Sequence, residues 1–301
     1  MGLGLICMLK FGNTFVNVGG TYLTGWDCFV PPDLQPGVLR IKYKDGVVPS
    51  WEYATFTQVS VSPNVWDITP TYKTRWNNVL YWSNRNDILE MVWGNSEGVQ
   101  YMNDMFAGCT ALSAVNGLDT TNITDLSTLF FHCNSLSSAP MLNTTNCTSM
   151  NSMFAGCPIS TVPNYNTNNV KNMTDMFNSC NNLTGVPTFN TTNVIKMDTM
   201  FYGCSSLREI PLFDTSNVTS MYSTFEDCSG LSSLPLLNTN SLKYAGYTFE
   251  NCVNVVSGAL ALYTQMSTQP SITSHNGCFR NCGSNTQAGA AELAQIPDDW
   301  K

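Results

Sequence analysis

Apolar residues recur along this chain with a long period. A Phe-x-x-Cys pair occurs seven times with cysteine spacings of 23 or 24 residues, and further apolar side chains stand ten and seven positions before each of these cysteines. An eighth pair, Phe279 and Cys282, follows after a longer gap. Positions −10, −7, −3 and 0 fall on one stripe of a helix with about 3.6 residues per turn. The pattern therefore predicts a short helix that ends near each cysteine, as in NVTSMYSTFEDC.

The segment after each cysteine carries an apolar-x-x-apolar-Pro pattern, as in LSSLPLL, which predicts a strand ended by a turn. One helix and one strand cannot bury an apolar face alone, whereas stacked repeats bury it continuously. The expected fold is therefore an α/β solenoid, a leucine-rich-repeat-like right-handed array of 24-residue coils with a parallel sheet, preceded by a small β-rich N-terminal cap. A strand before the first coil is expected near Ile88–Trp93.

The recurrent Phe and Cys residues are assigned to the core, where Cys acts as a small buried apolar residue. Each cysteine has two equivalent neighbours in adjacent coils, so reduced thiols are expected rather than a disulfide framework. The predicted core residues are Phe106, Cys109, Phe130, Cys133, Phe154, Cys157, Phe177, Cys180, Phe201, Cys204, Phe225, Cys228, Phe249 and Cys252.

The pattern divides the chain into four segments. Residues 1–37, rich in Gly, Asn and Pro, are expected to form an N-terminal arm or anchor, with the natural start at Met1 or Met8 left open. Residues 38–87 are expected to form a β-rich capping domain, 88–262 the solenoid, and 263–301 a C-terminal cap.

Local patterns within the two caps predict individual elements. VLRIKYKDGVV alternates apolar and basic residues before Asp45-Gly46, which predicts a strand followed by a hairpin turn. Val59 and Val61 predict a second half-buried strand. Helices are expected at residues 74–82, 258–269 and 288–295.

Charge limits the classes of partner. Charged residues make up 11% of the chain and the formal net charge is −8, so the basic face that nucleic acid requires is not expected. No run of about 18 apolar residues is present, and membrane insertion is not expected.

The titratable residues do not predict catalysis. The chain has two histidines, and its carboxylates lack paired-acid spacing. His132 occupies a turn position beside the repeat cysteine. His275, Cys278 and Cys282 form H-x2-C-x3-C, for which a zinc site, a disulfide and a free buried Cys282 are the alternatives. Because a fourth ligand is not evident, a metal site is not expected. Because no set of catalytic residues is evident either, a cofactor and enzymatic activity are not expected.

The repeat resembles the leucine-rich repeats of BspA-like bacterial surface proteins, in the variant M-x-x-M-F-x-x-C-x-x-L, over about residues 88–262. Departures are Cys147 in a Val position, the deletion after Cys157, and Ala245 in the last unit. The sequences on either side of the repeats, RIKYKDGVVPSW and GAAELAQIPDDWK, also resemble those of repeat proteins carried by tailed phages and prophages of gut bacteria. These resemblances imply surface recognition or adhesion.

The expected function is that of a non-enzymatic phage virion surface protein, a head or tail fibre or decoration module, that presents the solenoid for host-surface binding. A BspA-like adhesin on a bacterial cell surface is the alternative. The arm is expected to contact other virion proteins, within a homo-oligomer. The expected partner is a host cell-surface glycan or protein, bound on the outward strand face by Ser137, Ser138, Thr184, Thr188, Arg208, Glu209, Ser232 and Ser233.

Overall fold

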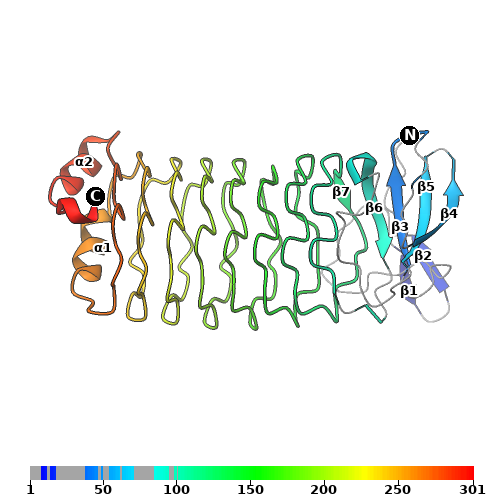
Figure 1. Ribbon diagram of the computed structural model, residues 1–301, viewed down its shortest axis with the longest axis horizontal. Coiled ribbons are helices and arrows are strands. Elements are labelled where there is room, and N and C mark those ends of the chain that lie inside the picture. Colours follow the sequence, from blue (N-terminus) through cyan, green and yellow to red (C-terminus); the bar gives the residue numbers. More distant parts are fainter. Residues whose placement is uncertain are drawn as a thin grey trace.

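The computed structural model describes residues 8–11, 14–17, 38–46, 49, 54–61, 63–70, 85–94, 98–99 and 101–301. A small sheet lies at one end of the long axis, and the repeats follow one another along that axis (Figure 1). Two short helices lie at the other end. The core runs through the middle of the repeats.

The sheet near the N-terminus has five strands in the order β4-β5-β3-β6-β7. Neighbouring strands are antiparallel except β6 and β7, which are parallel. A separate two-stranded hairpin, β1 with β2, lies within the segment expected to be an arm. The elements are β1 (Met8–Phe11), β2 (Thr14–Asn17), β3 (Leu39–Tyr43), β4 (Ala54–Ser60), β5 (Val65–Pro70), η2 (Arg85–Asp87), β6 (Ile88–Gly94) and β7 (Ala114–Val115).

Strand β3 forms because its apolar residues alternate, so that Leu39, Ile41 and Tyr43 are all buried. Its neighbours are β5 and β6, so the turn at Asp45-Gly46 does not join two paired strands and the hairpin expected there is wrong. Strand β6 covers the strand expected near residues 88–93.

Two other expectations in this part of the chain have different outcomes. Val59 and Val61 are 46% and 76% exposed, so the half-buried strand face expected from them is wrong. The helix expected at residues 74–82 lies outside the described residues.

The α/β solenoid expected from the repeat is wrong. In the described residues, regular structure consists of the five-stranded mixed sheet, the pair β1 and β2, two short α-helices and two 3-10 helices. From residue 116 to residue 258 the chain forms turns and isolated bridges, with no helix and no continuous strand. The apolar period that predicted helices therefore has another cause.

Successive tight turns produce that period. The N–H of Met105 donates to the carbonyl oxygen of Met102 at 3.1 Å, and the N–H of Cys109 donates to that of Phe106 at 3.0 Å. The third residues of these turns, Asp104 and Gly108, have φ of 62° and 71°, which type II turns require and a right-handed helix excludes. The residues with positive φ five positions before each cysteine are Asp104, Thr128, Ser152, Asp175, Thr199, Ser223 and Tyr247.

The turns leave alternate N–H groups available to the next repeat. The N–H of Phe177 donates to the carbonyl oxygen of Met200, and that of Phe201 to the carbonyl oxygen of Thr224, each at 2.9 Å. The same bonds recur at positions −7, −5, −3 and −1 relative to the cysteine, in repeat after repeat. The backbone of this segment is therefore bonded partly within its own repeat and partly along the stack.

The parallel sheet expected after each cysteine does not extend through the repeats. After Cys109, β7 pairs in parallel with β6. In later repeats the contacts are single hydrogen bonds, such as that from the Ser160 N–H to the Ser137 carbonyl oxygen at 3.3 Å, and one isolated bridge between Ser233 and Ser257. Most of the isolated parallel bridges lie on another segment, in a row that includes Asp125, Ser149 and Asn172. Single-residue bridges of this kind do not constitute strands.

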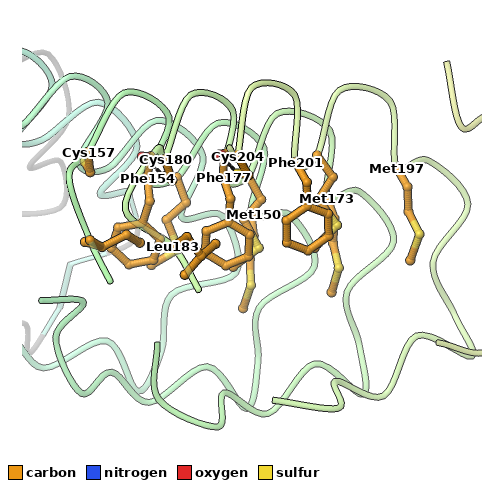
Figure 2. Close-up of a cluster of buried hydrophobic side chains, with 14 of the residues drawn as sticks. Met150, Phe154, Cys157, Met173, Phe177, Cys180, Leu183, Met197, Phe201 and Cys204 are labelled. Carbon is orange, nitrogen blue, oxygen red and sulfur yellow. Dashed lines mark hydrogen bonds between the residues drawn. The ribbon is translucent and has the colours of Figure 1, made fainter. Parts of the chain in front are cut away.

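The predicted core residues line the interior. All of the recurrent Phe and Cys residues are at most 1% exposed. The phenylalanine rings stack face to face, with centroids 6.1 Å apart for Phe154 and Phe177 and 5.5 Å apart for Phe177 and Phe201 (Figure 2). Met150, Met173 and Met197 fill the space beside the rings.

The recurrent Asp/Asn-Thr-x-Asn motif explains much of the polar composition. In one copy, the carboxylate of Asp214 accepts from the Ser216 hydroxyl and from the Ser216 N–H, the latter at 2.9 Å, and these two hydrogen bonds lower the pKa of Asp214. The buried Thr215 donates its hydroxyl to the Asn238 carbonyl oxygen at 2.8 Å. Asn217 donates its side-chain amide backwards to the Thr192 carbonyl oxygen at 2.8 Å. One motif thus connects a repeat to both of its neighbours.

The C-terminal end of the stack is closed by α1 (Ala259–Met266), α2 (Gln287–Leu293) and η3 (Asp298–Trp300). Both expected helices form, with shorter bounds than predicted for α1. Trp300 follows Phe279 at the end of the ring stack, with ring centroids 6.3 Å apart, and its carbonyl oxygen accepts from the Phe279 N–H at 2.9 Å. This last segment therefore supplies the contacts that a further repeat would make.

The turn geometry predicts opposite effects for two glycine substitutions. Gly203 has φ of 70°, and a Cβ there meets nothing closer than 3.8 Å. Gly203→Ala should therefore lower the free energy of unfolding by about 1 kcal/mol through backbone conformation alone.

Gly185→Ala is the matched control, because a Cβ at Gly185 meets nothing within 4 Å and its φ lies outside the left-handed region. That variant should be unchanged or more stable by about 0.5 kcal/mol. Urea unfolding measures both, and equal stability of the two variants would show that the turn assignment is incorrect.

Candidate functional site

The candidate binding face lies on the segments that follow the cysteines. Each of the eight side chains predicted to bind a partner is exposed. The segments that carry them follow Cys133, Cys180, Cys204 and Cys228. These residues are Ser137, Ser138, Thr184, Thr188, Arg208, Glu209, Ser232 and Ser233.

Backbone hydrogen bonds place part of this face in one column. The Arg208 N–H donates to the Thr184 carbonyl oxygen, and the Thr184 N–H to that of Ser160, each at 3.3 Å. Ser160 is bonded in turn to Ser137. Sequence reasoning missed Ser160 because the 23-residue repeat places its hydroxyl three residues after the cysteine instead of four.

Large apolar side chains stand beside the hydroxyl groups. Leu212 and Leu236 are 74% and 63% exposed, whereas Ile210 and Leu234, two residues earlier, are 7% and 6% exposed. The buried pair fixes the segment to the core, and the exposed pair faces outward. The face therefore offers hydroxyl groups, one guanidinium and apolar surface.

A second group of unusual residues precedes the cysteines and was missed from the sequence. Two positions before the cysteine, successive repeats carry Tyr202, Glu226, Glu250 and Arg280, where the earlier repeats carry the uncharged residues Ala107, Phe131, Ala155 and Asn178. The Gly203 N–H donates to the Glu226 carbonyl oxygen at 2.8 Å, which places these positions side by side. The appearance of charged residues at a position that is uncharged in the earlier repeats was the available signal.

The two glutamates of this column differ electrostatically. Arg280 forms an ion pair with Glu250, with an N–O distance of 2.9 Å. Burial raises the pKa of Glu226, and the nearby charges of Glu250 and Asp227 raise it further, while a hydrogen bond from Ser223 opposes the shift. The carboxyl group of Glu226 therefore releases its proton less readily in the folded protein than in the unfolded chain.

The buried thiols have a structural role. The Cys204 thiol donates to the Phe177 carbonyl oxygen at 3.1 Å, and the Cys228 thiol donates to that of Phe201 at 3.0 Å. Burial raises the pKa of Cys204 to about 12. The ten described cysteines are thiols that take no part in a disulfide, whereas Cys7 and Cys28 lie outside the described residues. A Phe-x-x-Cys pair thus bonds one repeat to the previous one.

The histidines and the C-terminal cysteines do not form a metal centre in this structure. The His275 ring stacks on Trp300, with centroids 4.1 Å apart, while Cys278 and Cys282 are free and buried. No group of three His, Cys, Asp or Glu side chains within the described ranges is arranged to hold a metal ion. His132 is exposed, with φ of 55°.

None of the helices in the described part of the chain is long and apolar enough to cross a membrane.

A family model described as "Mycoplasma protein of unknown function, DUF285" matches residues 100–207, 148–263 and 181–287. The overlapping matches together extend from residue 100 to residue 287, which is more than half of the 301-residue chain. They support a BspA-like repeat protein exposed on a surface and give no support to a phage origin. No curated protein and no solved structure gives a significant match.

The buried thiols should be unreactive in the native protein. A thiol whose pKa is raised to about 12, as for Cys204, is almost entirely protonated at pH 8, and the thiolate is the nucleophile. A colorimetric disulfide reagent should therefore label the ten described cysteines only after denaturation. Rapid native labelling of more than the two cysteines outside the described residues would contradict this, and denatured protein serves as the control.

Glu226→Gln should stabilise the protein at neutral pH. The raised pKa of Glu226 means that the folded state binds the proton more tightly than the unfolded state, so stability falls as pH rises through that pKa. Removing the charge should raise the free energy of unfolding by about 0.5 kcal/mol at pH 7, after allowance for solvent screening.

The gain should vanish at a pH below the ordinary pKa of glutamate, where both side chains are neutral. Glu250→Gln is the control, because it removes the partner of Arg280 and should give no gain at pH 7. Urea unfolding at both pH values measures the effect, and a loss of stability in Glu226→Gln at pH 7 would refute the assignment.

Proposed function

This chain belongs to the family described as Mycoplasma protein of unknown function, DUF285, and on that premise we propose that it is a non-enzymatic surface protein whose stacked repeats bind a partner on a cell surface. The observation that carries the proposal is the outward face of the segments after the cysteines. There the exposed polar side chains of successive repeats stand in register on a backbone bonded from repeat to repeat.

The chemistry of this face fits a host cell-surface glycan or protein. Hydroxyl groups at Ser137 and Ser232 and the guanidinium of Arg208 supply hydrogen-bond donors to sugar or carbonyl oxygens. The Thr184 hydroxyl, which donates to the Ser160 carbonyl oxygen at 3.4 Å, supplies an acceptor. The exposed side chains of Leu212 and Leu236 offer apolar surface to a sugar ring or to apolar side chains. Repeat proteins commonly bind partners on extended surfaces of this kind.

We propose that the protein is a component of a phage virion, where it serves as a head or tail fibre or decoration module. Free, buried cysteines fit a protein that folds in a reducing cytoplasm before it joins a particle. The alternative is an adhesin on a bacterial cell surface, which the family description favours because it names Mycoplasma. Mass spectrometry of purified virions and of peptides released by protease from intact cells distinguishes the two alternatives.

Assembly through the N-terminal segment belongs to the same proposal. Residues 1–37 would contact other virion proteins within a homo-oligomer, and the repeats would project away from that contact. Strands β1 and β2 lie in this segment and pair with each other, from Met8 opposite Asn17 to Phe11 opposite Thr14.

Charge reversal on the face tests the binding role. The double variant Arg208→Glu/Ser232→Glu should weaken the binding of labelled protein to gut bacterial cells and to an immobilised glycan array by about ten-fold. Its thermal stability should remain close to that of the parent, because both side chains are exposed.

The matched control is Lys171→Glu/Thr145→Glu, which makes the same change in charge at exposed positions on the segments before the cysteines. Binding by the control should equal that of the parent protein. Loss of binding in both double variants, or in neither, would refute the proposed face.

A further inference from the structure

Three tyrosines and three carboxylates gather on the segments before Cys204, Cys228 and Cys252. We call this group the tyrosine–carboxylate surface. Backbone hydrogen bonds link its repeats, from the Gly203 N–H to the Glu226 carbonyl oxygen at 2.8 Å and from the Asp227 N–H to the Glu250 carbonyl oxygen at 2.9 Å. Its members are Tyr202, Tyr222, Tyr247, Glu226, Asp227 and Glu250.

The aromatic rings of this surface are accessible and ordered by their neighbours. The rings of Tyr222 and Tyr247 meet edge to face, with centroids 5.4 Å apart, and Tyr222 remains 44% exposed. The charge of Asp227, to which Tyr202 is also hydrogen-bonded, raises the pKa of that tyrosine. The rings and carboxylates therefore form one connected group.

One half of this surface already holds a cation from the chain itself. The guanidinium of Arg280 lies over the Tyr247 ring, 5.2 Å from its centroid, and donates to a carboxylate oxygen of Glu250 at 2.9 Å. An aromatic face together with a carboxylate is an arrangement that favours a guanidinium group. Arg280 is thus an internal example of what this chemistry binds.

The other half of the surface, with Tyr222, Glu226 and Asp227, also combines an aromatic ring with carboxylates, but these carboxylates form no ion pair with a basic side chain in the described residues. Asp227 accepts a hydrogen bond from the neutral side chain of Asn251 at 2.9 Å. A cation is therefore the missing complement to Glu226, Asp227 and Tyr222.

This concentration of charge does not stabilise the stack. Side chains of like charge in adjacent positions are destabilising, and the raised pKa of Glu226 reflects that repulsion in part. Earlier repeats carry uncharged pairs at the same two positions, as in Ala107-Gly108, Ala155-Gly156 and Asn178-Ser179. Charged residues that lower the stability of a repeat are typical of functional sites.

We infer that the tyrosine–carboxylate surface is a docking site for an arginine side chain presented by a protein partner, with Glu226 and Asp227 as its carboxylates and Tyr222 as its aromatic face. The surface is distinct from the proposed hydroxyl-bearing face, because it lies before the cysteines rather than after them. Its negative charge, in a chain of net charge −8, disfavours nucleic acids and anionic lipid headgroups.

The test uses the full chain and three short capped peptides of the sequence Gly-X-Gly-X-Gly, in which X is arginine, lysine or citrulline. Citrulline has the shape of arginine without its charge. Isothermal titration at low ionic strength should show binding of the arginine peptide, about ten-fold weaker binding of the citrulline peptide, and intermediate affinity for the lysine peptide.

Three variants locate the binding. Glu226→Gln should weaken binding of the arginine peptide by about ten-fold. Glu209→Gln removes the same charge from the other face and should leave the affinity within about two-fold of the parent. Arg280→Gln frees Glu250 and Tyr247, and should strengthen binding by about three-fold or more.

Thermal unfolding of each variant distinguishes loss of the fold from loss of the site. Tyr222→Phe keeps the aromatic ring and should retain binding of the arginine peptide. Tyr222→Leu removes the ring and should lose that binding. Equal binding of the citrulline and arginine peptides would overturn the inference. So would an equal effect of Glu209→Gln and Glu226→Gln, which would reduce the interaction to general attraction by a negatively charged protein.

Discussion

In every repeat, alternate backbone N–H groups of the segment before the cysteine donate to the next repeat, and the groups between them close tight turns. This alternation is possible because two residues in each repeat, such as Thr199 and Gly203, have positive φ. Without those residues the segment would close on itself as a helix, and no donors would remain for the neighbouring repeat. The stacking of the phenylalanine rings and the thiol bonds to their carbonyl oxygens depend on the spacing that these backbone bonds set.

The same constraint accounts for the composition. A chain bonded along its whole length to equivalent neighbours places identical side chains next to one another, so a charged consensus residue would create a row of like charges. Threonine and asparagine avoid that repulsion and also donate to carbonyl oxygens one repeat away, as Thr215 and Asn217 do. The scarcity of charges and the abundance of Thr and Asn in this motif are therefore consequences of the repeat.

The limits of sequence reasoning have the same origin. The period identified the core positions of residues such as Phe201 and Cys204, because burial depends only on which residues return in register. The α/β solenoid was wrong because turns with positive φ reproduce the apolar spacing of a helix. The residues at those positions are mostly Asp, Ser and Thr, and these residue types do not predict a left-handed backbone conformation as glycine does. On the candidate face, exposed positions such as Arg208 followed from the repeat, whereas Ser160 did not, because the single deletion shifts the alignment there.

A strict repeat also determines where recognition can arise. The interior positions are fixed by stacking, and the Thr and Asn positions by their bonds to neighbouring repeats, so only the outward positions are free to differ. Two sets of outward positions do differ: those after the cysteines, with Arg208, Leu212 and Leu236, and those before them, with Tyr222 and Glu226. Equivalent positions in two adjacent repeats lie one repeat apart, so one ligand group could contact the side chains of both. The two surfaces proposed above therefore both include residues from the C-terminal half of the stack.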